Sequence, residues 1–174
     1  NMFALYMFGK ILEQVWGPKR FLTYYMITGI GAGSIQLLVT ELRIQSLISD
    51  IDPAMYQQIL DEGLSIRQMG KNYIDPIAAE INNLINISTV GASGAVFGIL
   101  LAFGMLFPNT QLMLIIPPIP MKAKYFVLIY GAIELYQGIA SNPNDNVAHF
   151  AHLGGMLFGF VMIKIWKTNT NNFY

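Results

Sequence analysis

Long apolar runs alternate with short polar stretches along this chain, and one polar stretch is much longer than the others. The apolar runs cover residues 1–16, 21–40, 90–107, 124–140 and 147–166. Because an α-helix rises about 1.5 Å per residue, a run of about 20 residues crosses a hydrocarbon core of about 30 Å. The first run is short for a span, and we expect its first turn to lie upstream of Asn1. The pattern predicts one bundle of membrane-spanning helices over residues 1–174.

The long polar stretch, residues 41–89, has a different character. It holds seven acidic residues and three basic ones. Asp52-Pro53 and Asp75-Pro76 are typical helix starts, with aspartate as the N-cap and proline at the first helical position. The apolar residues after the second start share one helix face: Ile77, Ile81, Leu84 and Ile85. We expect this insertion to lie on or above the membrane surface, as an amphipathic cover.

Composition supports a membrane protein. Charged residues make up 11% of the chain and hydrophobic residues 54%, with a mean hydropathy of +0.48. A soluble domain has about 25% charged residues. The absence of cysteine excludes disulfides, zinc–thiolate sites and thiol catalysis. A net charge of zero and the lack of a basic run give no indication of nucleic-acid binding.

Positive charge predicts the orientation of the spans. Basic residues gather at alternate ends of successive spans: Lys10, Lys19, Arg20, Lys122, Lys124, Lys164 and Lys167. The positive-inside rule makes that side cytoplasmic. The insertion then lies outside, and Asn1, Ser93, His149 and His152 all lie near the outer ends of their helices at similar depth.

The third run, residues 90–107, opens with the small-residue motif Gly91-Ala92-Ser93-Gly94. Taken alone, this motif is explained by packing, because small residues let membrane helices approach closely. Gly94 and Gly98 form a ridge one turn apart that suits such an approach. A nucleophilic role for Ser93 requires a base at the same depth.

The last run supplies that base in the motif Ala151-His152-Leu153-Gly154-Gly155. An ionisable residue within a span is costly and is a functional candidate, although an interhelical hydrogen bond is the plain alternative. Gly155 and Gly159 lie on the face of His152. That smooth face can press against the glycine ridge of the serine helix and bring the imidazole to Ser93.

Three further side chains bear on this pair. Phe97, one turn after Ser93, can stack on the His152 ring. His149 is a rival base, but the glycine spacing favours His152, so we interpret His149 as a supporting hydrogen-bonding residue. Neither Glu134 nor Asp145 is placed to complete a triad, and we expect Glu134 to face water at a helix end. A serine–histidine dyad without an acid is workable.

These residues resemble the motifs of the rhomboid family of intramembrane serine proteases. Residues 91–94 resemble its Gly-x-Ser-Gly motif, which makes Ser93 the nucleophile. Residues 151–155 resemble its Ala-His-x-x-Gly motif, which makes His152 the base, and Phe97 stands where the family carries a stacking aromatic. Asn1 resembles the asparagine that ends a His-x-x-x-Asn motif and helps to bind the oxyanion with the Ser93 N–H.

The resemblance implies an all-α, polytopic, rhomboid-like helix bundle with five of six core transmembrane helices present. The first span, the loop after it and the histidine paired with Asn1 would lie upstream, and the insertion at about 41–89 is longer than the family pattern suggests. The implied activity is serine endopeptidase cleavage of membrane-anchored proteins near the outer side of the bilayer. The partners would be transmembrane substrates and lipid, with no metal or organic cofactor, in a multi-pass protein of a bacterial cell membrane.

Two alternatives remain at this point. One is a catalytically inactive rhomboid-like protein that binds membrane segments without cutting them. The other is a small polytopic transporter, in which Glu134, His149 and His152 would line a proton or substrate path. The transporter hypothesis predicts that activity depends on these three residues and not on Ser93.

Overall fold

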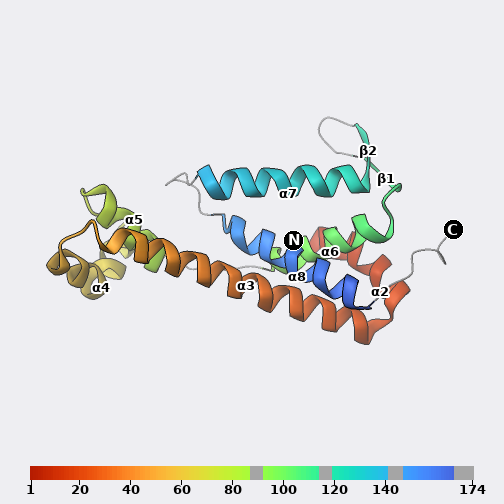
Figure 1. Ribbon diagram of the computed structural model, residues 1–174, viewed down its shortest axis with the longest axis horizontal. Coiled ribbons are helices and arrows are strands. Elements are labelled where there is room, and N and C mark those ends of the chain that lie inside the picture. The colour runs from red at the N-terminus through yellow and green to blue at the C-terminus, as the bar shows by residue number, and fades with distance from the viewer. Residues whose placement is uncertain (87–91, 114–118, 141–146, 167–174) are drawn as a thin grey trace. The chain divides into compact units, whose positions relative to one another are not determined.

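A computed structural model describes residues 1–86, 92–113, 119–140 and 147–166 of the chain (Figure 1). The chain divides into two compact units. Unit 1 comprises Asn1–Gln36, Gly91–Ser141 and Val147–Tyr174, and unit 2 comprises Leu37–Val90 and Asn142–Asn146.

Unit 1 begins with one helical stretch built of three segments. These are α1 (Met2–Ala4), the π-helical segment η1 (Leu5–Gly9) and α2 (Lys10–Trp16). The stretch ends at Gly17, whose φ of 77° lies in the left-handed region that glycine adopts without strain. Pro18 then opens α3 (Pro18–Ile48), as a proline at the first helical position does.

Helix α3 extends beyond the predicted end of its apolar run. The sequence pattern placed the end at Thr40, whereas the helix continues to Ile48 and so passes from unit 1 into unit 2. Residues 41–48 contain neither glycine nor proline, and the Gln45 side chain donates a hydrogen bond of 2.7 Å to Glu41 one turn earlier. A change from apolar to polar residues therefore ended the predicted span without ending the helix.

The remaining elements of unit 1 are α6 (Ser93–Leu106), β1 (Gln111–Met113), β2 (Pro120–Lys122), α7 (Ala123–Ala140) and α8 (His149–Trp166). The predicted helix at 90–107 begins at Ser93 instead, with Ala92 as its N-cap. Strands β1 and β2 pair antiparallel, with Leu112 opposite Met121, in the stretch between the apolar runs 90–107 and 124–140. The other two predicted runs match α7 and α8 to within a few residues.

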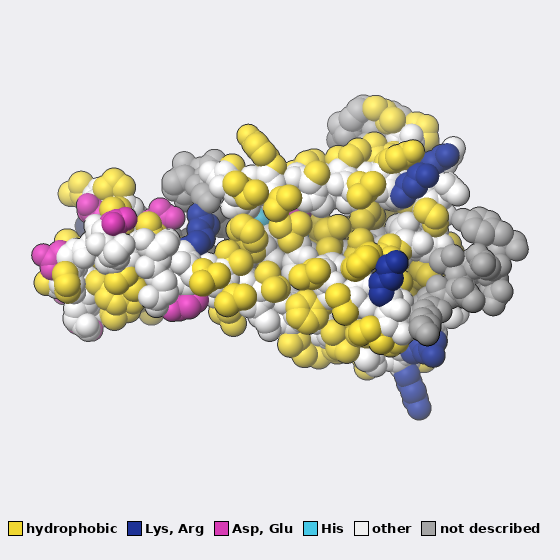
Figure 2. All heavy atoms as spheres, in the orientation of Figure 1, with side chains coloured by type: hydrophobic (Ala, Val, Ile, Leu, Met, Phe, Trp, Pro, Cys, Tyr) yellow, Lys and Arg dark blue, Asp and Glu magenta, His cyan; other side chains and the backbone are white. Residues whose placement is uncertain are grey.

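The core of unit 1 is apolar and aromatic. Its buried members are Leu12, Trp16, Tyr24, Ile99, Ala102, Leu106, Met162 and Ile163. The Tyr24 hydroxyl donates a hydrogen bond of 2.7 Å to the Gly98 carbonyl and also lies against Gly159. This buried hydroxyl thus joins α3, α6 and α8 at one point. Hydrophobic side chains also cover much of the visible surface of unit 1 (Figure 2).

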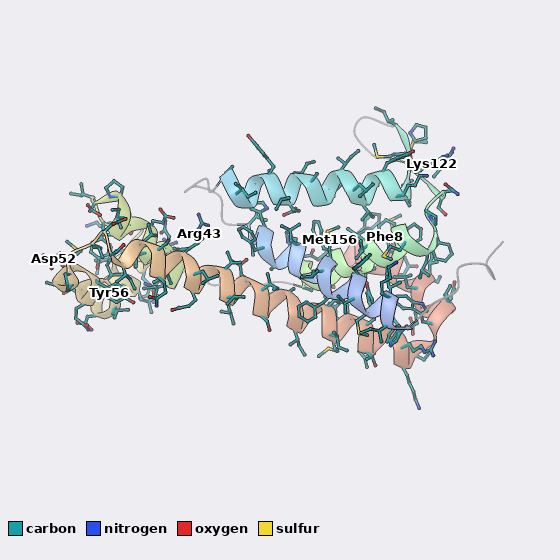
Figure 3. All side chains as sticks on the ribbon, in the orientation of Figure 1. Phe8, Arg43, Asp52, Tyr56, Lys122 and Met156 are labelled. Atoms are coloured by element: carbon teal, nitrogen blue, oxygen red, sulfur yellow. The ribbon has the colours of Figure 1, made fainter. Side chains whose placement is uncertain are left out.

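Unit 2 is built from the end of α3 with α4 (Pro53–Gln68) and α5 (Pro76–Asn86). Both predicted aspartate caps are present: Asp52 accepts from Ala54 N and Asp75 accepts from Ala78 N, each at 2.8 Å. Figure 3 shows Asp52 at the start of α4. The core of the unit contains Ile59, Ala78 and Ile81, with Ile77 and Ile85 packed against it, so the predicted apolar face of α5 is largely confirmed.

Acidic side chains gather on unit 2, where Figure 2 shows them in magenta. A buried amide, Asn82, adds a feature that the pattern does not predict. It donates to Asn72 and accepts from Asn86, both at 2.8 Å, so its polar atoms are satisfied.

The predicted all-α class is confirmed. Among the described residues, α3 and α8 are long and apolar enough to cross a membrane, and α6 is a shorter apolar helix. The expectations of five core spans, of a single domain over 1–174 and of an extracytoplasmic insertion at 41–89 stay predictions.

Candidate active site

Small residues of α6 and α8 let the two backbones pack directly against each other. A Cβ on Gly155 would collide with the carbonyl group of Gly94. A Cβ on Gly98 would lie 3.0 Å from the Gly155 carbonyl oxygen, and one on Gly94 would lie 3.0 Å from that of Ala151. Any larger side chain at these positions would push the helices apart. The close approach predicted from the glycine spacing is therefore present.

This approach brings the Phe97 and His152 rings together. Their centroids lie 4.1 Å apart and their planes are inclined by only 7°, so the rings are stacked face to face. His152 is buried, with 7% of its surface exposed. The stack, which the spacing of the two motifs predicts, restricts the imidazole to one plane.

Ser93 is the first residue of α6 and lies one turn before Phe97 on the same side of the helix. Its side chain is half-buried. Among the described residues, the Ser93 hydroxyl makes no hydrogen bond to His152; such bonds are often long in the absence of substrate. Gly91, the first glycine of the motif, lies outside the described residues.

The expectation that Glu134 faces water is wrong. Glu134 is buried in α7, with 8% of its surface exposed, and its Oε2 lies 2.6 Å from His149 Nδ1 and 2.8 Å from His152 Nδ1. Two imidazoles thus share one carboxylate oxygen. An acid is therefore placed beside the histidine that was expected to work without one.

The packing of α7 along α8 builds this contact (Figure 1). A Cβ added at Gly131 would lie 3.1 Å from the Met156 side chain, and a Cβ added at Gly138 would lie 3.3 Å from the His149 Cβ. In Figure 3, Met156 points from α8 toward α7. Glu134 lies between these two glycines on the same face of α7, because residues three and four apart share a helix face. Because α7 and α8 run antiparallel in this register, the Glu134 carboxylate lies beside the first turn of α8.

One signal in the sequence could have found this role. Glu134 is the only acidic residue in the run 124–140, and an acid within an apolar helix usually faces the bundle interior and pairs with another polar group. The spacing of residues within α7 does not show which neighbouring helix it pairs with.

The same three side chains could also hold a metal ion. One donor atom from each of Glu134, His149 and His152 lies within 4.8 Å of the other two, and all three residues are buried. Two imidazoles and a carboxylate are a common zinc ligand set. As described, however, the donors are already joined to one another by hydrogen bonds.

Asn1 precedes α1 and is exposed, and its side chain does not cap that helix. Its backbone carbonyl accepts a hydrogen bond of 2.9 Å from Leu5 N. Within the described part of the chain, no hydrogen bond joins the Asn1 amide to Ser93 or His152. Its role at an oxyanion site stays a prediction.

Comparison with known families identifies the architecture that holds these residues. The family model of the Rhomboid domain matches residues 1–168. The chain belongs to the rhomboid family. Rhomboid proteins are integral membrane proteins, and the apolar α3 and α8 of this rhomboid are consistent with that.

A curated relative of this rhomboid is Rhomboid protein 1, mitochondrial, of Saccharomyces cerevisiae. The two sequences are 23% identical over 159 residues, which are 91% of this chain and 34% of the relative. The chain therefore spans about a third of the length of that protein. No solved structure gives a significant match.

Proposed function

We propose that this rhomboid is an intramembrane serine endopeptidase that cleaves membrane-anchored proteins with a Ser93–His152 dyad. The observation that carries the proposal is the junction of α6 and α8, where the helix that begins with Ser93 packs against the helix that holds His152. The glycine contacts and the Phe97 stack fix the relative height of the two helices at that junction. Gly94 and Gly155 support the site as packing residues, and Gly91 belongs to the same motif.

In the proposed reaction, the Ser93 Oγ attacks the scissile carbonyl carbon while His152 takes the hydroxyl proton. The tetrahedral intermediate then loses its C–N bond, and His152 gives the proton to the leaving amine. Water then attacks the acyl carbon while His152 takes a proton from it, and the bond from that carbon to Ser93 Oγ breaks as His152 returns the proton to Oγ. His152 therefore acts in turn as a general base and a general acid.

Two donors are proposed for the oxyanion. Ser93 is the first residue of α6, so its N–H has no acceptor within its own helix and lies at the positive end of the helix dipole. The Asn1 side-chain amide is the second donor. Each such donor lowers the barrier by about 3 kcal/mol. The hydrolysis requires water, which we propose reaches the site from the outer side of the membrane. We predict that this membrane is a bacterial cell membrane.

The test uses the protein expressed from its complete reading frame, reconstituted into liposomes with a single-span reporter. Ser93→Ala and His152→Ala should each abolish cleavage, and a fluorophosphonate probe should label Ser93. Ser34→Ala is the matched control, because Ser34 is exposed and its hydroxyl donates a hydrogen bond to the Ile30 carbonyl of its own helix. Undiminished cleavage by either dyad variant would overturn the proposal.

The same reconstitution separates the alternatives. An inactive membrane-segment binding protein would retain the reporter without cutting it, and the presence of both Ser93 and His152 argues against this function. The buried group of Glu134, His149 and His152 is the one observation that suits a transporter. Proton or solute flux that is lost in variants of those three residues and retained in Ser93→Ala would favour transport over proteolysis.

A further inference from the structure

Glu134 is an acid buried in an apolar helix, and such a group needs polar partners. An unpaired buried carboxylate is strongly unfavourable, and an acid within a membrane-spanning segment usually faces a functional partner. The partners here are both histidines of α8, each through Nδ1 and each to the same oxygen, Oε2. Glu134 is therefore held at the site by the two histidines of α8, one of which is the proposed base.

The protonation of both rings follows from the chemistry of the carboxylate. An ionised carboxylate has only lone pairs and accepts hydrogen bonds without donating any. Each nitrogen that faces Oε2 must then carry the proton. A neutral His152 ring beside an ionised Glu134 is the Nδ1–H tautomer, and its Nε2 keeps the lone pair that a general base needs.

Two contacts together define the orientation of the His152 ring. The Phe97 stack fixes the plane of the ring. The hydrogen bond from Nδ1 to Glu134, at 2.8 Å, fixes its rotation within that plane. Neither contact alone does both, because stacking tolerates rotation of a ring in its own plane and one hydrogen bond tolerates tilt.

We propose that Glu134 is a positioning residue for His152: its Oε2 accepts the Nδ1 proton and leaves Nε2 as the nitrogen that takes the Ser93 proton. This inference rests on the proposed peptidase function and extends it from a dyad to an arrangement of three groups. Ser-His-Asp enzymes use their buried aspartate in the same way, to hold the tautomer and orientation of the histidine. Here the acid comes from α7 and touches a second histidine as well.

The role of His149 follows from its geometry. Its ring is perpendicular to that of His152, with centroids 6.4 Å apart, and its Nδ1 lies 2.6 Å from Glu134 Oε2. It does not share the Phe97 stack. His149 therefore helps to hold the carboxylate in place, while His152 is the ring that the carboxylate orients toward catalysis.

The main test compares Glu134→Gln with wild type in the liposome assay. Glutamine keeps the shape of the side chain but replaces the charged carboxylate with a neutral amide. It therefore lacks the ionised oxygen that accepts a hydrogen bond from the Nδ1–H of each histidine. We expect kcat to fall by about 100-fold or more, with KM changed less than about threefold, because only the transition state needs the oriented base. Glu134→Asp, which keeps the carboxylate, should recover part of kcat. Glu13→Gln is the control, since Glu13 is an exposed glutamate in the same unit.

A spectroscopic test does not depend on any variant of Glu134. The ¹⁵N signals of histidine-labelled wild-type protein, assigned by comparison with His149→Ala, should show His152 protonated at Nδ1 and unprotonated at Nε2. A His152 ring that carries its proton on Nε2 in the wild type would overturn the proposal, even if Glu134→Gln failed to fold.

The outcomes separate this inference from the proposed function. If Ser93→Ala and His152→Ala abolish cleavage while Glu134→Gln retains kcat within about twofold of wild type, the dyad stands and the role of Glu134 is wrong. If Ser93→Ala still cleaves the reporter, the proposed serine-peptidase mechanism with the Ser93–His152 dyad is itself wrong.

Discussion

The ring of Phe97 lies face to face with the ring of His152, with the centroids 4.1 Å apart. Phe97 is on α6, one turn after Ser93, and His152 is on α8. This stack is thus a direct link between the helix of the proposed nucleophile and the helix of the proposed base. It makes Phe97 a specific target for testing whether the orientation of the imidazole matters.

Replacing Phe97 should slow the reaction without unfolding the protein. Phe97→Ala removes the phenyl ring that stacks on one face of the His152 imidazole. Aromatic pairs contribute about 0.5–1.5 kcal/mol to stability beyond simple burial. We expect kcat to fall about two- to tenfold in the reporter assay, with a smaller loss for Phe97→Tyr. Phe160→Ala is the control, because Phe160 is exposed on α8. Equal rates for the Phe97 and Phe160 variants would contradict a positioning role for the stack.

Adding a methyl group at Gly155 should destabilise the protein much more than adding one at Gly33. The new Cβ would collide with the Gly94 carbonyl, so α6 and α8 must separate. Overpacking of this kind costs about 1–3 kcal/mol, and the displacement should also reduce cleavage. Thermal unfolding in detergent measures the first effect and the reporter assay the second.

Gly33→Ala provides the comparison for that substitution. Gly33 is also helical, but a Cβ there meets nothing within 4 Å. Alanine favours a helix over glycine by up to about 1 kcal/mol, so this variant should be as stable as wild type or slightly more stable. A Gly155→Ala protein that matched Gly33→Ala in stability and activity would disprove the tight contact.

His149→Ala should leave measurable cleavage. The variant removes one of the two donors to Glu134 Oε2 but retains the hydrogen bond from His152 and the Phe97 stack. We expect a loss of about tenfold in kcat, in line with the loss of one charge-assisted hydrogen bond that acts indirectly. Complete inactivity, together with residual activity in His152→Ala, would exchange the roles of the two histidines.

Chelation should not reduce cleavage. The donors of Glu134, His149 and His152 already satisfy one another through hydrogen bonds, and the proposed chemistry uses no Lewis acid. Incubation with EDTA, followed by dialysis and the reporter assay, should therefore give the rate of the untreated protein. Loss of activity that zinc restores in wild type, and not in Glu134→Gln, would show that the cluster is a metal site.

Local sequence signals predicted most of the helices and the approach of the Ser93 helix to the His152 helix, but not the position of Glu134. Asp52 and Asp75 mark helix starts because a capping carboxylate and the following proline act within a few residues. The pairing of the Gly94 and Gly155 faces was also predictable, since only small residues permit backbones to approach so closely. The length of α3 was not, because polarity limits a membrane span but does not end a helix.

The amino-acid sequence by itself determined the helical class of this rhomboid and the two motifs that carry Ser93 and His152, since helix periodicity and small-residue spacing are local properties of the chain. Only the tertiary structure decided which way the Glu134 side chain faces and which groups it contacts. Its side chain could have faced water or the bundle, and the choice depended on how α7 rotates about its axis as Gly131 and Gly138 pack on α8. That rotation is set by contacts between residues of different helices. It places the Glu134 carboxylate, which we expected to face water, within hydrogen-bonding distance of both histidines.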